Sequence, residues 1–178
     1  MPRDAFDILG VPARFDLSPA AIRSAYLALS ARLHPDAVEP SAASDPDAQA
    51  RAAELNAAKQ SLDDPESRAD LLLRRLGGPA KEQDKSLPAT FLAEMLHTRE
   101  LIEEALQSRD DSRIDPWRDW AADRRRRHIA TVGELFAALD HPAGRLAPDL
   151  RAAHLRSIRA ELNMWRYIER LIEQLEPH

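Results

Sequence analysis

The sequence predicts an all-α protein with two parts: an antiparallel helical hairpin with short flanking helices, then an antiparallel three-helix bundle. Only 5 glycines are present in 178 residues and β-branched residues are few, so the residues that favour strands and hairpin turns are scarce. The dominant residues, Ala, Leu, Arg and Glu, are good helix formers. Apolar residues also recur at intervals of three and four, as they do along one face of a helix.

The bulk composition argues against several classes of protein. Charged residues make up 31% of the chain and hydrophobic residues 44%, which is typical of a folded globular protein. The formal net charge is −5, and both halves of the chain are mildly acidic, unlike a nucleic-acid-binding domain. There is no cysteine for disulfides or thiolate chemistry. Without a signal peptide or a membrane-spanning run, we expect a cytoplasmic protein that binds neither membrane nor nucleic acid.

The first elements form the predicted hairpin. "DAFDIL" can make one or two helical turns, which Gly10 and Pro12 close. A long helix begins after Ser18, a good N-cap followed by a proline suited to the first helical position. Its apolar face consists of Ile22, Ala25, Tyr26, Leu29 and Leu33. Pro35 must end this helix, because proline cannot continue it and biases the preceding residue away from helical geometry.

A polar, proline-containing loop over 37–47 leads to a second helix at roughly 48–63. The apolar face of that helix consists of Ala52, Leu55, Ala58 and Leu62. "DPESRADLLLRRLGG" predicts a shorter helix that ends at two glycines. The next segment, "GGPAKEQDKSLP", has no periodicity and is rich in Gly, Pro and charge, as linkers are. We therefore divide the chain into a domain at 1–76, a linker at 77–88 and a second domain at 89–178.

Three helices are predicted in the second domain, at about 89–108, 115–140 and 148–176. Asp115-Pro116 suits the start of the middle one, as N-cap and first helical residue. The apolar rhythm of the last one runs through His154, Ile158, Leu162, Trp165, Ile168, Ile172 and Leu175. Short loops between long helices favour an antiparallel bundle.

Two leucines in the 89–108 helix lie off its core stripe. At about 100° per residue, Phe91, Met95, Ile102 and Leu106 cluster on one face. Leu92 and Leu96 fall roughly 60–120° away from that face, beside Glu100 and Glu103. Tyr167 and Leu171 fall similarly off the stripe of the last helix. The pattern fits a partner surface, and it equally fits a wide apolar face or scattered surface leucines.

Neither a basic run nor an enzyme-like cluster offers a strong competing site. "DRRRRHIA" at 123–130 contains Arg124–Arg127, but four consecutive helical residues spread over all faces. We read the run as a solvated, salt-bridged helix, with Arg124 and His128 turned to a packed side. The histidines show no metal-ligand spacing, and no phosphate loop, carboxylate pair or nucleophile is recognisable. We expect no enzyme, no metal and no cofactor.

The flanks of His34-Pro35-Asp36 resemble those of a known family. Alone, the tripeptide reads as a helix stop with solvated polar residues. "DAFDILGVP", "AYLALSARLHPDA" and "LNAAKQSLDDPESRADLLL" together resemble the J-domain of DnaJ-type co-chaperones, which places His-Pro-Asp in the loop between two long helices. The resemblance implies that a DnaK/HscA-type ATPase chaperone is contacted here. We assign that contact to His34, Pro35, Asp36, Arg23, Arg32 and Tyr26.

The second half narrows the resemblance. "TFLAEMLHTRELIEEA" and "LNMWRYIERLIEQLE" are similar to the helical C-terminal domain of HscB, an iron–sulfur cluster co-chaperone that delivers the scaffold protein IscU to its ATPase partner. By alignment of these motifs, the scaffold-binding positions are Leu92, Leu96, Glu100, Glu104, Tyr167, Ala93 and His97. We expect a monomer or weak dimer.

Three positions depart from the family pattern. Ala37 stands where a basic residue often follows the aspartate, Ala93 where a larger apolar residue is common, and His97 where an acid is common. These departures leave open a J-domain co-chaperone for a different client. The arginine run separately leaves open a helical nucleic-acid-binding protein acting through Arg124–Arg127.

Overall fold

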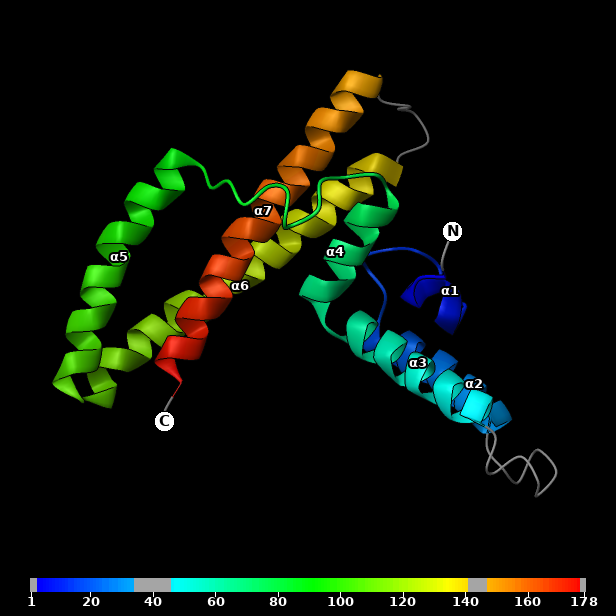
Figure 1. The fold of residues 1–178 in the computed structure, drawn as a ribbon. Coiled ribbons are helices and arrows are strands. Elements are labelled where there is room, and N and C mark those ends of the chain that lie inside the picture. Colours follow the sequence, from blue (N-terminus) through cyan, green and yellow to red (C-terminus); the bar gives the residue numbers. More distant parts are fainter. Residues whose placement is uncertain (1–2, 34–45, 141–146, 177–178) are drawn as a thin grey trace. The chain divides into compact units, whose positions relative to one another are not determined.

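The computed structural model describes residues 3–33, 46–140 and 147–176, in which every regular element is an α-helix. The all-α prediction is therefore confirmed. The chain divides into two compact units, Met1–Leu72 and Leu73–His178, which we treat separately (Figure 1). None of the described helices is both long enough and apolar enough to span a bilayer.

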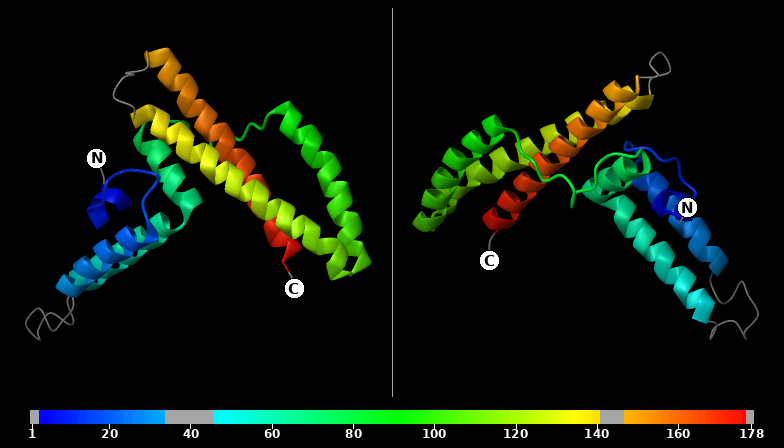
Figure 2. Two further views of the ribbon diagram at one scale, coloured as in Figure 1. Left: turned by 180° about the vertical axis from the view of Figure 1, so that it is seen from behind. Right: turned by 45° about the horizontal axis from the view of Figure 1, so that its top comes forward.

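The N-terminal unit is a helical hairpin with a short helix packed against it. α2 (Pro19–Leu33) and α3 (Pro46–Asp63) lie side by side, and α1 (Ala5–Leu9) contacts both (Figures 1 and 2). α4 (Pro65–Arg75) follows α3 after a single residue and continues into the second unit. The buried core of the unit consists of Ala5, Phe6, Leu9, Phe15, Ile22, Leu55, Ala58, Leu62, Ala69 and Leu72. The face predicted for the second long helix supplies three of these residues.

Local sequence explains how α1 begins and ends. The Asp4 carboxylate accepts from the Asp7 backbone N–H at 3.1 Å, and the Asp7 carboxylate accepts from the Asp4 N–H at 3.3 Å. This reciprocal pair satisfies two N–H groups that a helix start leaves without partners. Gly10 ends the helix at φ 63°, in the left-handed region that glycine enters without strain.

Arg68 on α4 ties three segments of the N-terminal unit together. Its Nε donates to the Phe15 carbonyl at 2.9 Å, its Nη1 donates to the Leu62 carbonyl, and its guanidinium lies 5.4 Å from the Phe15 ring centroid. The side chain is only 8% exposed. Burial lowers the pKa of Arg68, against the opposing charges of Asp64 and Asp63. A buried cation here holds the segment before α2 and the end of α3 against α4.

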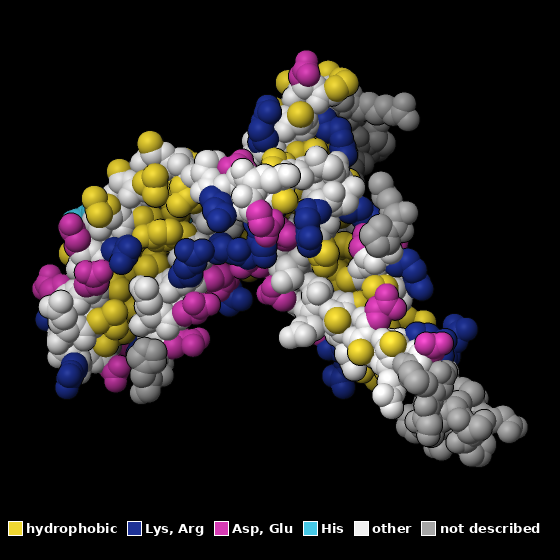
Figure 3. Space-filling model, viewed as in Figure 1, with side chains coloured by type: hydrophobic (Ala, Val, Ile, Leu, Met, Phe, Trp, Pro, Cys, Tyr) yellow, Lys and Arg dark blue, Asp and Glu magenta, His cyan; other side chains and the backbone are white. Residues whose placement is uncertain are grey.

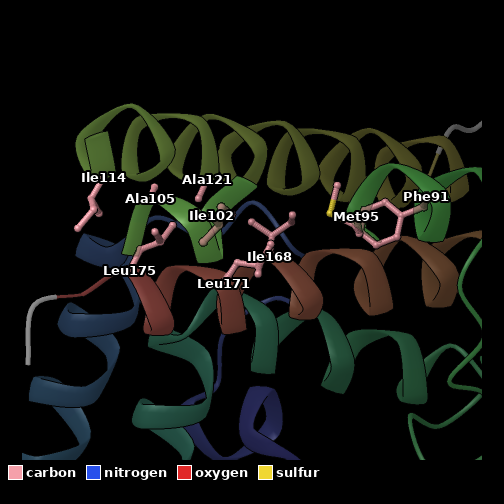
Figure 4. Close-up of a cluster of buried hydrophobic side chains, with 9 residues drawn as sticks. All are labelled: Phe91, Met95, Ile102, Ala105, Ile114, Ala121, Ile168, Leu171 and Leu175. Atoms are coloured by element: carbon pink, nitrogen blue, oxygen red, sulfur yellow. The ribbon is translucent and has the colours of Figure 1, made fainter. Parts of the chain in front are cut away.

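The C-terminal unit is a bundle of α5 (Ala89–Ser108), α6 (Asp111–Asp140) and α7 (Pro148–Leu175). α6 and α7 run side by side, and α5 packs at the end of the bundle where α6 begins and α7 ends (Figures 1 and 2). Figure 4 shows the cluster that joins all three helices: Phe91, Met95, Ile102, Ala105, Ile114, Ala121, Ile168, Leu171 and Leu175. Leu171 is thus a core residue, and the expectation that it belongs to a partner surface was wrong.

The middle helix of this unit begins earlier than predicted. Asp110, rather than Asp115, precedes its first turn, and the Asp110 carboxylate accepts from the Ser112 Oγ at 2.7 Å and the Ser112 N–H at 3.0 Å. These hydrogen bonds lower the pKa of Asp110. Pro116 lies inside the helix, close to its start. Asp115 instead accepts from Arg118 Nη1 at 2.7 Å, a contact that raises the pKa of Arg118.

The segment at 77–88 is held against α7 by backbone-directed hydrogen bonds. Arg159 Nε donates to the Pro79 carbonyl at 2.9 Å. Asn163 Nδ2 donates to the carbonyls of Asp84, at 3.1 Å, and Ser86, at 3.0 Å. A linker needs no such anchoring, so this stretch behaves as part of the surface of the C-terminal unit.

Candidate functional site

The two leucines that lie off the core stripe of α5 are exposed. Leu92 is 48% exposed and Leu96 is 67% exposed, whereas Phe91, Met95 and Ile102 are buried. Leu92 and Leu96 are therefore not part of the buried core, and the interpretation of a wide core face does not hold for them. Ala93 beside them is exposed as well. We call Leu92, Leu96 and Tyr167 the apolar patch. Figure 3 shows apolar side chains gathered over this part of the C-terminal unit.

Tyr167 enters the patch from α7. Its ring meets that of Phe91 in a T-shaped contact, with centroids 5.6 Å apart and planes at 86°. Phe91 in turn meets His128 edge-on at 6.3 Å, and His128 Nδ1 lies 2.6 Å from Glu161 Oε1. T-shaped pairs are favoured because a ring edge meets the negative face of its neighbour. The half-buried Tyr167 is therefore held against α5 at Phe91, the residue directly before Leu92 in the sequence.

The acidic residues predicted beside the patch are exposed, and each lies near a basic side chain of this unit. Glu104 accepts from Arg113 Nη2 at 2.9 Å. The Glu100 carboxylate lies 4.0 Å from His97 Nδ1. Exposed ion pairs of this kind are weak. The C-terminal half of α5 thus keeps an acidic character, which Arg113 offsets in part at Glu104.

The arginine run on α6 is ion-paired along its length. Arg124 pairs with Glu94 and lies 5.5 Å from the Trp120 ring centroid. Arg125 pairs with Glu169 at 2.8 Å. Arg126 and Arg127 both pair with Asp123. The reading of a salt-bridged helix is confirmed, and a carboxylate beside each arginine opposes the approach of nucleic-acid phosphates.

The predicted chaperone contact is only partly within the described residues, since His34, Pro35, Asp36 and Ala37 lie outside them. On α2, Arg23 and Arg32 are exposed. They are nine residues apart, about 180° around a helix, so they do not share one face. Arg32 instead lines a hollow of about 310 Å³ with Arg3, Arg51 and Leu29.

Tyr26 is used within the hairpin. Its hydroxyl donates to Asn56 Oδ1 on α3 at 2.8 Å, and Lys59 Nζ lies 5.7 Å from its ring centroid. The residue therefore sets the spacing of α2 and α3, whatever else it contacts.

A basic pocket beside the apolar patch was missed by sequence reasoning. It has a volume of about 360 Å³ and is lined by Lys81, Glu82, Lys85, Leu87, Asn163, Arg166, Tyr167 and Arg170. The α7 residues recur at intervals of three and four, a signal that was available in the sequence. The contribution of Lys81 and Lys85 was not, because it depends on how residues 77–88 lie on α7.

Comparison with known proteins identifies both units. A family profile described as "DnaJ domain" matches residues 4–71, and one described as "HSCB C-terminal oligomerisation domain" matches residues 87–176. A "Co-chaperone protein HscB homolog" from Burkholderia thailandensis is 32% identical over 137 residues, which cover 74% of this chain and 76% of that protein. Its counterpart from Bordetella parapertussis is 29% identical over 179 residues, covering 97% and 94% of the two chains.

Solved structures agree with these sequence relatives. The chaperone HscB from Vibrio cholerae superposes with a TM-score of 0.65 at 25% identity, over 98% of this chain and 100% of that one. The human co-chaperone protein HscB superposes with a TM-score of 0.75 at 19% identity, over 98% and 81% of the two chains, which supports the fold alone.

Proposed function

Because this chain belongs to the HscB family of co-chaperones, we propose that its C-terminal unit holds an IscU-type scaffold protein while its N-terminal unit engages a DnaK/HscA-type ATPase. The protein is a co-chaperone of iron–sulfur cluster assembly and not an enzyme. Its partner of the Hsp70 type performs the ATP hydrolysis, and the cluster is cargo of the scaffold. The exposure of Leu92 and Leu96 beside Tyr167 is the observation that carries the scaffold-binding part of this proposal.

The apolar patch has the features of an interface centre. Two exposed leucines and an aromatic ring that is already ordered can be covered with little loss of side-chain entropy. Covering a fully exposed leucine is worth about 1.5–3 kcal/mol, and these two are half and two-thirds exposed. Together they supply about 2–3 kcal/mol, or roughly 30- to 150-fold in affinity. The exposed carboxylates of Glu100 and Glu104 then favour a partner that carries basic residues next to its own apolar contact.

A scaffold titration tests this assignment. Leu92→Ala/Leu96→Ala is expected to weaken binding of the IscU-type scaffold protein from the same organism by roughly 30- to 100-fold in calorimetry. Leu101→Ala is the matched control, since Leu101 is an exposed leucine of the same helix about 180° round from Leu92. Equal affinities for the two variants would remove the patch from the proposal.

The N-terminal unit supports a contact at the end of α2. That helix stops at Leu33, directly before His34-Pro35-Asp36, and α3 returns beside it. Proline has a restricted backbone, so the polar residues on either side of Pro35 lose less entropy when a partner orders them. The Asp36 carboxylate can pair with an arginine, and His34 supplies a directional donor and acceptor. No proton transfer is needed, because a co-chaperone shifts its partner between conformations by binding one of them better.

Stimulation of ATP hydrolysis tests the chaperone contact. His34→Gln is expected to abolish stimulation of the partner ATPase while leaving scaffold affinity unchanged, because the patch lies in the other unit. Arg156→Ala, an exposed arginine of α7, serves as the control. Wild-type stimulation by the His34 variant would contradict this assignment.

A different client remains the second candidate. The exposed Ala93 and His97 make the patch smaller and less acidic than the family pattern, and Arg113 offsets the charge of Glu104. A pull-down that recovers the ATPase chaperone, but no cluster scaffold, would favour this candidate.

A further inference from the structure

We propose that the basic pocket beside the apolar patch receives an acidic segment of the same protein partner that covers Leu92 and Leu96. The proposal rests on the proposed function and adds the second half of the docking surface. The pocket is formed by the 77–88 segment and one face of α7, and its cations are Lys81, Lys85, Arg166 and Arg170.

The pocket is positively charged, whereas the chain as a whole is negatively charged. Four cations and one acid, Glu82, line it, in a protein whose formal net charge is −5. The nearby Asp84 turns its carboxylate to Ser86, whose Oγ donates to it at 2.6 Å and whose N–H donates at 2.9 Å. These two hydrogen bonds lower the pKa of Asp84, so its carboxylate stays ionised. The carboxylate is hydrogen-bonded to Ser86, two residues further along the chain.

The pocket cations differ from the arginines of α6. Each member of Arg124–Arg127 pairs with a carboxylate of this chain. Among the described residues, Lys81, Lys85 and Arg170 take part in no ion pair. Three unpaired cations in one hollow that holds a single acid, Glu82, repel each other, and a partner carboxylate relieves that repulsion. Figure 3 shows Lys and Arg side chains gathered where α7 and the 77–88 segment lie.

The shape of the pocket is fixed by contacts that the scaffold patch does not use. Asn163 lines the pocket and donates to the Asp84 and Ser86 carbonyls. These hydrogen bonds hold the segment that contains Lys85 against α7. Arg159 does the same at Pro79, ahead of Lys81. The cations therefore project from an anchored backbone and not from a free loop, so less entropy is lost when they bind.

Tyr167 belongs to both the pocket and the apolar patch. It lines the pocket, and its ring packs on Phe91, the residue directly before Leu92. Leu87 also lines the pocket and packs against the core cluster just ahead of α5. Along α5 the surface then passes from Leu92 and Leu96 to Glu100 and Glu104. The partner that fits carries acids, an apolar contact and basic residues in that order.

The order of charges points to a protein as the occupant. A free anion needs only the pocket, and it gains nothing from the adjoining leucines. A protein segment gains from both, because its acids steer it to the pocket and its apolar side chains cover the patch. The volume of about 360 Å³ lies near the lower end of the roughly 300–1,000 Å³ typical of ligand pockets.

Charge reversal in the pocket tests the inference. Lys85→Glu/Arg170→Glu is expected to weaken binding of the IscU-type scaffold by roughly tenfold at 50 mM salt and by about twofold at 500 mM, mainly through a slower association rate. Arg126→Glu/Arg156→Glu is the matched control, with two exposed arginines of the same unit outside the pocket and the same change in net charge. It is expected to change the affinity by less than about twofold.

Three results would overturn the inference. The first is an equal effect of the pocket and control variants, which makes the effect one of net charge. The second is binding of 10 mM inorganic phosphate in the pocket of the unmodified protein, at constant ionic strength, with no loss of scaffold affinity, which makes the pocket a small-anion site that the scaffold does not use. The third is full affinity of the pocket variant while Leu92→Ala/Leu96→Ala loses binding, which leaves the proposed function standing alone. If both variants keep full affinity, the proposed function fails as well.

Discussion

Replacing Arg68 with methionine tests whether one buried cation holds the N-terminal unit together. Methionine keeps much of the side-chain volume but removes the donors to the carbonyls of Phe15 and Leu62. Each buried carbonyl left without a partner costs about 1–2 kcal/mol, and the lost contact with the Phe15 ring adds about 0.5–1 kcal/mol. The release of the guanidinium from its buried site offsets part of this sum. We expect a net loss of about 2–3 kcal/mol in the free energy of unfolding of this unit.

The distribution of tryptophans gives an assay for one unit at a time. All three, Trp117, Trp120 and Trp165, lie in the C-terminal unit, so their fluorescence reports that unit alone, while circular dichroism reports helices of both. With a urea m-value of about 1 kcal/mol/M for a unit this small, the first part of the dichroism transition moves down by about 2–3 M. The fluorescence transition stays in place.

Two further variants sharpen that experiment. Arg68→Lys keeps the charge but only part of the hydrogen bonding, so its transition is expected between those of the unmodified protein and Arg68→Met. Arg23→Ala removes an exposed arginine from the same unit and is expected to change stability by less than about 0.5 kcal/mol. An unmoved dichroism transition in Arg68→Met, or an equal shift in fluorescence, would refute the reasoning.

Two other predictions use the same pair of signals. Gly77 has φ +83°, where alanine is strained, so Gly77→Ala is expected to lower the free energy of unfolding of the C-terminal unit by about 1 kcal/mol, measured by fluorescence. Gly10 has φ +63° in the N-terminal unit, so Gly10→Ala is expected to move only the dichroism transition. Hydrogen bonds from Ser112 lower the folded-state pKa of Asp110, so the ionised carboxylate stabilises the fold above its ordinary pKa of 3.8, and that stabilisation is lost as pH falls through the lower folded value. Asp110→Ala should therefore lower the fluorescence-detected urea midpoint at pH 7 and match the unmodified protein near pH 2; a pH-independent difference would contradict this.

Local sequence signals predicted most of the helices because their causes are local. The ends of α5 were predicted at the residues where they lie, since Pro88 precedes its first turn and apolar residues of its buried face continue to Leu106. The start of α6 was misplaced because two aspartates each suit a helix start, and only the contacts of Ser112 choose between them. Leu171 was misjudged because a single-helix stripe ignores α5, which packs on that side of α7.

Of the candidate sites, the apolar patch could be predicted from the sequence and the basic pocket could not. Exposure of Leu92 and Leu96 follows from helix periodicity, which is why sequence could suggest the patch. The basic pocket could not be predicted, because Lys85 lines the same pocket as Arg170 only where the hydrogen bonds of Asn163 hold a stretch without periodicity on α7. The role of Arg68 could not be predicted either, because it donates hydrogen bonds to backbone carbonyls. Every residue has a backbone carbonyl, so the sequence does not indicate which ones a side chain will bind.

The balance of apolar and charged contacts suits a protein that must release what it binds. A patch with two partly exposed leucines supplies only about 2–3 kcal/mol, so an apolar contact alone holds a partner briefly. Enlarging it would slow release, because dissociation rates respond most to buried contacts. Charges at the edge act chiefly on the association rate, as a basic pocket at one end and acids at the other orient the approaching partner. Fast capture and early release can then coexist, as the proposed transfer of a scaffold to an ATPase requires.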